Sequence, residues 1–485
     1  MSTTVLPPSP TLPHKGGGRI DGALLKRFVA IVGEKYAITD PQAQEPYLVE
    51  MRQRWHGRTS LVLRPSTVAE VSEILKLANE TSTAIVPQGG NTGLVGGQLP
   101  YHGELILSLN RLDKIREVDP VSSTITCEAG VTLMRTREAA AAVDRLYPQL
   151  LPSEGTCTIG GNLSTNAGGT QAIAYGIARS HVLGIEVVLA DGRVMNNLNK
   201  LKKDNTGYDL KNLFIGSEGT LGIITAAVLR LVPRPRSVET AWLGVPSPEA
   251  AVEFLNIAQE RSTGGVTSFE LMARMGVEVV VKHGPNMRYP LREQHPYSVL
   301  IELSSQAKSG LRAAMEEILA AGHERGLVLD ATIADNLQQG KEFWRLREMF
   351  GELQRHEGGS IKHDVSVPIA AIPEFIKEAN AAVVKLIPGA RPLPFGHVGD
   401  GNIHYNVTQP VGANTAEFMQ REEDVHDVVF AVVAKYNGSI SAEHGVGIVK
   451  RERLPQVKDK VAIDLMRTLK RTLDPKGILN PGKVL

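Results

Sequence analysis

The chain has 485 residues, too many for one ordinary core, so we expect two domains or one large domain with a cap. Lys and Arg number 53 against 52 Asp and Glu, and this net charge of +1 argues against nucleic acid as a partner. Cys127 and Cys157 are too few for a disulfide framework. No apolar run approaches the roughly 18 residues that a membrane span needs, so we expect a soluble protein.

Residues 1–20 combine Pro, Ser and Gly without an apolar core, which predicts a disordered tail. They lack the apolar centre of a secretory signal and the repeated arginines of a mitochondrial presequence. We therefore interpret the tail as an untargeted extension and expect a cytoplasmic protein.

The next part of the chain combines predicted helices and strands with three glycine-rich stretches. Thr67 and Glu70 form a capping box for a helix that runs to about Asn79, and residues 84–86 form a short apolar strand. The glycine-rich stretches span residues 87–97, 152–169 and 204–225. Each alone is more often a turn, but together they indicate a large bound anion, because glycine lets backbone N–H groups surround phosphate oxygens. A strict Gly-x-Gly-x-x-Gly is missing, which counts against a nicotinamide site.

Strand and helix signals also predict the layers of two domains. Residues 182–189 and 192–194 are predicted as two strands joined at residues 190–192, which is typical of an α+β layer. After residue 235 the pattern predicts an antiparallel sheet with helices on one face, a cap-like second domain. Its predicted strands are residues 240–245, 297–303 and 327–333, and its predicted helices are residues 247–261 and 311–325. A last amphipathic helix ends before Asp474 and Pro475.

Two histidines flank Asp400 and Gly401, a dipeptide that is the strongest short hairpin signal. A two-residue loop there pairs His397 with His404 and places their Cβ atoms ~5 Å apart on one face of the sheet. Asn406 is expected on the same face, because the side chains of a strand alternate. Two such imidazoles could share one metal ion, but two surface histidines in an ordinary hairpin are an equally good interpretation of this pair alone.

A third candidate ligand favours the metal site. Glu443 and His444 are adjacent in a glycine-flanked loop after the apolar residues 428–433. Catalytic zinc sites use three protein ligands and leave one position open, and His397, His404 and Glu443 would supply that set. His444 would then be available to take the proton of a substrate hydroxyl, since imidazole titrates near neutrality.

Two cationic residues of the second half are candidates for binding a carboxylate. Arg347 lies in a predicted helix and Lys362 in a strand-like segment. From composition alone a solvated charge is the more ordinary interpretation of each.

Seven motifs, in order, resemble those of the FAD-dependent D-2-hydroxyacid dehydrogenases of the vanillyl-alcohol oxidase and p-cresol methylhydroxylase superfamily. They are PQGGNTG, SEGTCTIGGNLSTNAGG, KDNTGYDL, GSEGTLGIIT, GHVGDGNIH, AEHGVG and LDPKGILNPGKVL. The resemblance implies an α+β protein with a two-part FAD-binding domain of the vanillyl-alcohol oxidase type, residues 21–235 and 436–485. Residues 236–435 would form an α+β ferredoxin-like cap domain that binds substrate and metal.

The same resemblance assigns roles to particular residues. It makes His397, His404 and Glu443 the zinc ligands, and it places Arg347, Lys362, Asn406 and His444 at the substrate, with His444 as the catalytic base. Residues 87–97 contain no histidine, so the FAD would be noncovalent. The implied FAD-binding residues are Pro87, Gln88, Gly89, Gly90, Asn91, Thr92, Gly93, Ser153, Gly160, Gly161, Asn162, Thr165, Asn166, Gly222, Ile224 and Asn480.

The implied reaction is the oxidation of a D-2-hydroxyacid, with D-2-hydroxyglutarate favoured and D-lactate or glycolate as the alternative. Zinc would polarise the hydroxyl group, His444 would take its proton and the C2 hydride would pass to flavin N5. The implied partners are an electron acceptor such as electron-transfer flavoprotein or a quinone, and a second copy of the chain in a homodimer. A metal- and flavin-binding subunit without turnover of its own is the alternative from a different class.

One position departs from the family members that act on D-2-hydroxyglutarate. Those members have a threonine four residues after the matching arginine, where this chain has Gly351. One hydroxyl donor is lost, but Arg347 and Lys362 would still favour a dicarboxylate.

Overall fold

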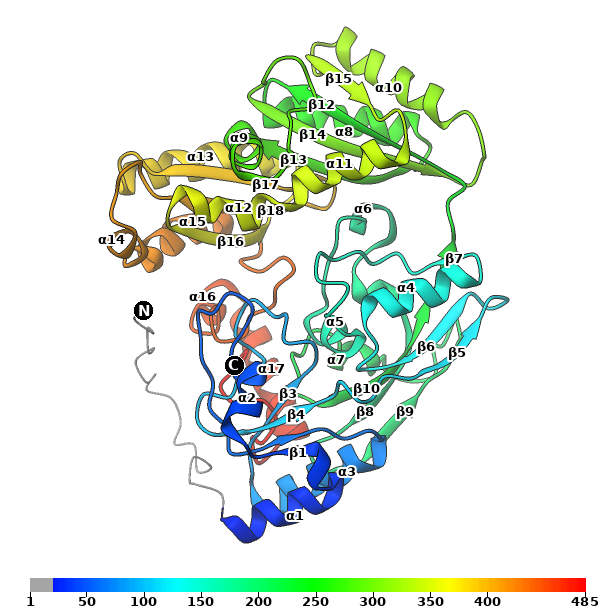
Figure 1. The fold of residues 1–485 in the computed structure, drawn as a ribbon, viewed down its shortest axis with the longest axis vertical. Coiled ribbons are helices and arrows are strands. Elements are labelled where there is room, and N and C mark those ends of the chain that lie inside the picture. The colour runs from blue at the N-terminus through cyan, green and yellow to red at the C-terminus, as the bar shows by residue number, and fades with distance from the viewer. Residues whose placement is uncertain (1–20) are drawn as a thin grey trace. The chain divides into compact units, whose positions relative to one another are not determined.

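The computed structural model describes residues 21–485, so the tail predicted over residues 1–20 lies outside the described residues. The chain forms two compact units, and each is built from separate segments (Figure 1). Among the described residues, the first unit contains residues 21–168, 177–233 and 443–485, and the second contains residues 169–176 and 234–442. Within the described part of the chain, every helix is too short or too polar to cross a membrane.

The first unit contains two main sheets. One has the strand order β1-β2-β4-β3, in which β2 and β3 run parallel to β4. Its strands are β1 (Ala37–Ile38), β2 (Val62–Leu63), β3 (Ile85–Gln88) and β4 (Leu105–Ser108). The other is antiparallel and has the order β5-β6-β10-β8-β9. Its strands are β5 (Ile115–Asp119), β6 (Thr124–Glu128), β8 (Val182–Val188), β9 (Val194–Asn197) and β10 (Ile223–Arg230).

Helices and the C-terminal segment complete the first unit. Helix α3 starts at the predicted capping box, where the side chains of Thr67 and Glu70 each accept from the other's backbone N–H. The C-terminal segment returns to β3, because Asn480 N donates to Ile85 O at 2.8 Å. The helices are α1 (Gly22–Val32), α2 (Pro41–Leu48), α3 (Val68–Thr81), α4 (Leu133–Ala142), α5 (Ile159–Thr165), α7 (Lys211–Phe214), α16 (Leu454–Val457) and α17 (Lys460–Leu473), and a short ladder joins β7 (Arg145–Leu146) to β11 (Val232–Pro233).

The second unit is built on one seven-stranded antiparallel sheet, in the order β15-β12-β14-β13-β17-β18-β16. Its strands are β12 (Ser237–Val245), β13 (Val266–Ala273), β14 (Tyr297–Ser305), β15 (Asp330–Ile333), β16 (Ser360–Ser366), β17 (Arg391–His397) and β18 (Asn402–Thr408). The run β12-α8-β13-β14-α10-β15 has the ferredoxin-like β-α-β-β-α-β order, with α9 inserted before β14.

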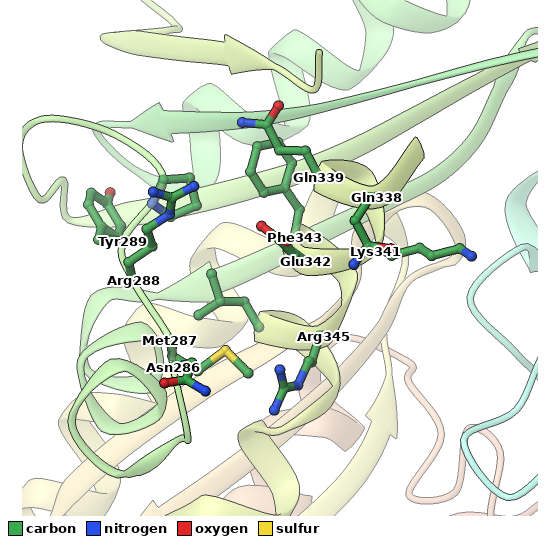
Figure 2. A pocket seen from close by; sticks show the side chains of 12 residues that line it. Asn286, Met287, Arg288, Tyr289, Gln338, Gln339, Lys341, Glu342, Phe343 and Arg345 are labelled. Atoms are coloured by element: carbon green, nitrogen blue, oxygen red, sulfur yellow. The ribbon is translucent and has the colours of Figure 1, made fainter. Parts of the chain in front are cut away.

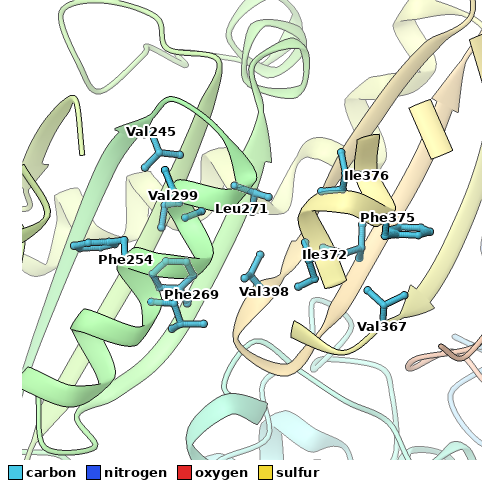
Figure 3. Packing of buried hydrophobic residues seen from close by; sticks show 14 of the residues in the cluster. Val245, Phe254, Phe269, Leu271, Val299, Val367, Ile372, Phe375, Ile376 and Val398 are labelled. Carbon is cyan, nitrogen blue, oxygen red and sulfur yellow. The ribbon is translucent and has the colours of Figure 1, made fainter. Parts of the chain in front are cut away.

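Helices cover both faces of this sheet, so the prediction of helices on one face is wrong. One face packs on α8 (Pro248–Arg261), α10 (Leu311–Glu324), α13 (Ile372–Leu386) and α15 (Glu422–Lys435); Figure 3 shows part of this apolar cluster, including Phe254, Phe269 and Phe375. The other face packs on α9 (Arg274–His283), α11 (Leu337–Glu348) and α12 (Phe350–Leu353). The reason lies in the strands. Leu243 and Trp242 are both fully buried, on opposite faces, and a strand buried on both faces is apolar without alternation.

Candidate functional site

The histidine hairpin forms, but its predicted register is wrong. A 3₁₀ turn at Val398–Asp400 and Gly401, whose φ is 88°, joins β17 to β18, so the loop is longer than the type I′ turn we expected. Val398 is fully buried in the apolar cluster of the second unit, which draws this turn out of the ladder. Phe395, rather than His397, is the partner of His404. Because the register moves by two residues, both histidines stay on one face as diagonal neighbours.

The two imidazoles point at each other through Nε2. The Nε2 atoms of His397 and His404 lie 3.3 Å apart. Each ring turns Nδ1 toward a carboxylate: Nδ1 of His397 lies 2.5 Å from Glu270 Oε1, and Nδ1 of His404 lies 3.8 Å from Asp364 Oδ1. Two nitrogens that bind one tetrahedral zinc ion at about 2.05 Å each are about 3.3 Å apart. The donor set therefore fits a divalent ion between the two rings.

Glu270 is buried in the middle of the second unit's sheet and links this pair to Arg347. Its Cα lies opposite His397 in the β13–β17 ladder, and its Oε2 accepts from Arg347 Nε at 2.7 Å. Burial raises the pKa of Glu270, but the charges of His397 and Arg347 outweigh burial and hold this pKa at about 2. The carboxylate is therefore ionised at neutral pH and accepts from both side chains.

The predicted substrate residues Lys362 and Asn406 lie on the same face as His404. They are ladder partners on β16 and β18, two residues from Asp364 and His404. Lys362 Nζ donates to Gly351 O at 2.8 Å, and the buried Asn406 donates through Nδ2 to Gln354 Oε1 at 2.7 Å. The second unit thus gathers two imidazoles, two cations and an amide, of which Arg347 comes from α11 and the rest from neighbouring strands.

Glu443 and His444 begin the last segment of the first unit. The residue before them, Ala442, belongs to the second unit and donates from its backbone to Asp364 O at 3.2 Å. After them, the backbone N–H groups of Val446 and Gly447 donate to the Glu218 carboxylate at 2.6 and 2.8 Å. Backbone hydrogen bonds therefore hold the chain on both sides of Glu443 and His444. The bond before Glu443 is to β16, the strand that pairs with β18.

The first two predicted FAD-binding loops pack tightly against each other within the first unit. A Cβ at Gly90 would lie 1.9 Å from Thr156 O, and a Cβ at Gly89 would lie 2.4 Å from Thr158 Oγ1. Among the described residues, buried Asn91 Oδ1, Thr158 Oγ1 and Asn480 Oδ1 have no hydrogen-bond partner. Orphaned buried polar atoms beside glycine backbone are what a polar cofactor such as FAD would satisfy.

Several predicted FAD residues also have structural roles. Gln88 Nε2 donates to Tyr47 O at 2.9 Å and to Gln98 O at 3.1 Å, which closes the loop that follows β3. Ile224 lies on β10 with its side chain in the apolar core, and Asn480 Nδ2 donates to Gly97 O at 3.0 Å. The remaining predicted residues lie on different elements. Pro87 is on β3, Thr92 and Gly93 are in the loop after it, Ser153 is in a turn, Gly160, Gly161, Asn162 and Thr165 are on α5 with Asn166 as its C-cap, and Gly222 directly precedes β10.

Sequence reasoning missed Glu270 and Gln354. Glu270 is the one charged residue of β13, a strand whose eight residues are all buried, and that isolation is a signal the sequence offers. Gln354 lies in a short 3₁₀ helix and has no comparable signal.

A separate cavity of about 620 Å³ lies in the second unit along α11 (Figure 2). Arg288, Lys341 and Arg345 line it together with the buried Phe343. None of the predicted site residues does, so this cavity is distinct from the histidine pair.

Comparisons with known proteins identify the family of the chain. Residues 59–197 match an FAD binding domain, and residues 234–484 match the C-terminal domain of FAD linked oxidases. The chain is 37% identical to D-2-hydroxyglutarate dehydrogenase, mitochondrial, of Danio rerio over 99% of this chain and 88% of that protein. It is 36% identical to the Arabidopsis thaliana protein of the same name over 96% of this chain and 82% of that one. The solved structure of p-cresol methylhydroxylase with substrate bound has the same fold, with a TM-score of 0.75 at 18% identity over 95% of this chain and 96% of that one.

The fold and these matches define a flavoenzyme, an FAD-dependent oxidoreductase with the α+β fold that we predicted. More narrowly, the chain belongs to the FAD-dependent D-2-hydroxyacid dehydrogenases, and it has the fold of p-cresol methylhydroxylase.

The cytoplasmic location expected from the tail is wrong. The relatives from fish and plant are both named as mitochondrial proteins.

The tight contact between the glycine-rich loops predicts a specific defect. Gly90→Ala should lose most bound FAD, because its Cβ would collide with the backbone oxygen of Thr156. The ratio of visible flavin absorbance to protein absorbance measures this. Gly155→Ala is the matched control, since a Cβ there meets nothing within 4 Å and should leave the ratio unchanged. Normal FAD content in Gly90→Ala would show that the loops need not pack this closely.

Proposed function

We propose that this enzyme oxidises D-2-hydroxyglutarate to 2-oxoglutarate, with noncovalent FAD and a zinc-like divalent ion. The observation that carries the proposal is the pair of imidazoles with facing Nε2 atoms, on the same sheet face as Lys362 and Asn406. The names of the relatives supply the substrate and support a mitochondrial location.

His397, His404 and Glu443 would hold the ion. The two histidines present Nε2 toward one point, and Glu443 follows Ala442, whose backbone is bonded to Asp364 on the neighbouring strand. A zinc ion held by three protein ligands would act as a Lewis acid toward the hydroxyl and carboxylate of the substrate.

His444 would act as the general base. It is adjacent to Glu443 in the chain, and the hydrogen bonds to Glu218 fix the loop that follows it. An imidazole is suited to accept the hydroxyl proton near neutral pH, while FAD supplies the acceptor for the C2 hydride.

Arg347 and Lys362 would select a dicarboxylate. Within the described part of the chain, Arg347 donates hydrogen bonds through Nε alone, which leaves its two terminal nitrogens for a carboxylate. Lys362 contributes a second cation from the face that bears His404. Asn406, held by Gln354, would donate to or accept from the substrate beside them.

Reduced FAD must then be reoxidised. We propose electron-transfer flavoprotein or a quinone as the acceptor, and a homodimer as the working assembly. Activity of the isolated, flavin-loaded chain with a dye acceptor separates this proposal from a binding subunit without its own turnover.

Removal of a histidine ligand should remove both metal and activity. His397→Ala and His404→Ala should each lose bound zinc, measured by elemental analysis, and nearly all turnover, while FAD stays bound in the other unit. His356→Ala is the control, because that histidine is exposed and lies outside the site. Full activity of a metal-free wild-type preparation would contradict the proposal.

Loss of the base should slow chemistry without loss of either cofactor. General-base catalysis typically contributes 10²–10⁴-fold, so His444→Asn should slow flavin reduction by about that factor. Stopped-flow absorbance under anaerobic conditions measures the rate constant. An unchanged rate constant, with FAD and metal retained, would assign the proton to another group.

Because Gly351 stands where related enzymes have a threonine, restoring that hydroxyl group should raise kcat/KM for D-2-hydroxyglutarate. A Cβ there meets nothing within 4 Å, so Gly351→Thr should fold. One added hydrogen bond contributes about 1 kcal/mol, so kcat/KM for D-2-hydroxyglutarate should rise roughly fivefold while that for D-lactate stays lower. Gly351→Val has the same shape without the hydroxyl group. An equal gain in that variant, or D-lactate as the better substrate of the wild type, would contradict discrimination by the second carboxylate.

A further inference from the structure

We propose that Glu270 is a positioning residue that uses one carboxylate to set both the metal-binding face of His397 and the substrate-binding face of Arg347. The inference rests on the proposed function, because it concerns the ion at the histidine pair and the carboxylate of the substrate. Nothing in the family matches assigns this residue a role.

Glu270 has almost no freedom to move. Strand β13 lies between β14 and β17, where the Cα of Glu270 faces Leu300 on one side and His397 on the other. The side chain is fully buried, and each oxygen has its own donor: Oε1 lies 2.5 Å from His397 Nδ1 and Oε2 lies 2.7 Å from Arg347 Nε. Two donors from different elements therefore meet on one rigid acceptor.

The contact with Glu270 determines which nitrogen of His397 faces the metal position. A buried carboxylate needs a compensating charge, and the permanently charged guanidinium of Arg347 supplies it. Because a carboxylate only accepts, the His397 nitrogen that faces Glu270, Nδ1, is the one that carries a proton. The lone pair is left on Nε2, which is the atom that faces His404. A carboxylate behind a histidine ligand fixes both tautomer and ring orientation in this way.

The same carboxylate orients Arg347. Its guanidinium lies over the Phe395 ring, with Cζ 4.8 Å from the ring centroid, while Nε is bonded to Glu270. The bond and the ring contact together fix the plane of the guanidinium group. Glu270 thereby couples the two ends of the substrate site, the ion at the hydroxyl end and the cation for a carboxylate.

His404 provides an internal contrast. Its Nδ1 lies 3.8 Å from Asp364 Oδ1, too far for a hydrogen bond, and that oxygen already accepts from Asn402 Nδ2 at 3.0 Å. Asp364 is therefore expected to contribute less to metal binding than Glu270, although both carboxylates stand behind a histidine.

The test compares Glu270→Gln with Glu270→Asp in the FAD-loaded full chain. Zinc affinity is measured first, by competition with a chromophoric chelator and without substrate. An amide has one acceptor oxygen, so it cannot accept from Arg347 and His397 at two separate oxygens, and its NH₂ group would favour the opposite imidazole tautomer where it faces His397. Glu270→Gln should therefore bind zinc 10–100-fold more weakly. Glu270→Asp retains the charge and should lie between that variant and wild type. If Glu270→Gln does not fold, the zinc affinity of Glu270→Asp is the test. A wild-type zinc affinity in Glu270→Asp would then overturn the proposal.

Two further measurements distinguish positioning from a general structural effect. Both Glu270 variants should raise KM for D-2-hydroxyglutarate, since Arg347 loses its fixed orientation. Glu302→Gln is the matched control: this carboxylate is half-buried on the neighbouring strand β14 but is bonded to Trp344 Nε1 at 3.0 Å, so zinc affinity should stay at the wild-type value. Equal weakening in Glu302→Gln would overturn the proposal. A wild-type protein that binds no zinc would refute the proposed function itself, whereas zinc bound equally by wild type and Glu270→Gln would refute only this inference.

Discussion

A carboxylate buried in the centre of a sheet must be paired, and this constraint at Glu270 organises the functional face of the second unit. Removing one partner from a buried ionic pair typically costs 3–5 kcal/mol, because the remaining charge is left uncompensated. Arg347 from α11 and His397 from β17 are therefore held to β13 by the same group. The pairing fixes two side chains at the positions where the proposed chemistry needs them.

The antiparallel sheet positions the rest of the site, because successive side chains of a strand point to opposite faces. His404 and Asn406 on β18 are the ladder partners of Asp364 and Lys362 on β16, while Tyr405, between the first two, packs in the apolar core of the opposite face. One face of three adjacent strands thus holds imidazole, amide, cation and carboxylate groups. The sheet is held rigid by the helices that cover both of its faces. The polar side chains of the site therefore keep their positions although they lie next to a large apolar core.

Sequence patterns predicted the elements better than their contacts. The capping box at Thr67, strand β8 and the motifs of the flavoenzyme family were predicted correctly, because they depend on neighbouring residues. Strand β9 begins at Val194, where the predicted strand of residues 192–194 ends. The register of the histidine hairpin was predicted wrongly, since burial of Val398 outweighed the local turn signal of Asp400 and Gly401. The face was still correct, because a two-residue shift preserves side-chain direction. The contact between Glu270 and His397 was not predicted, because the two residues are 127 positions apart in the chain.

The central claim is that His397 and His404 bind one divalent ion through their Nε2 atoms. Zinc K-edge X-ray absorption of the zinc-loaded holoenzyme tests it most directly. The account predicts two imidazole rings with Zn–N distances of about 2.0–2.1 Å, with the remaining ligands light atoms. Sulfur scattering at about 2.3 Å would contradict the account, because it would place the zinc at a cysteine instead. Absence of the outer-shell pattern of two imidazoles would contradict it equally.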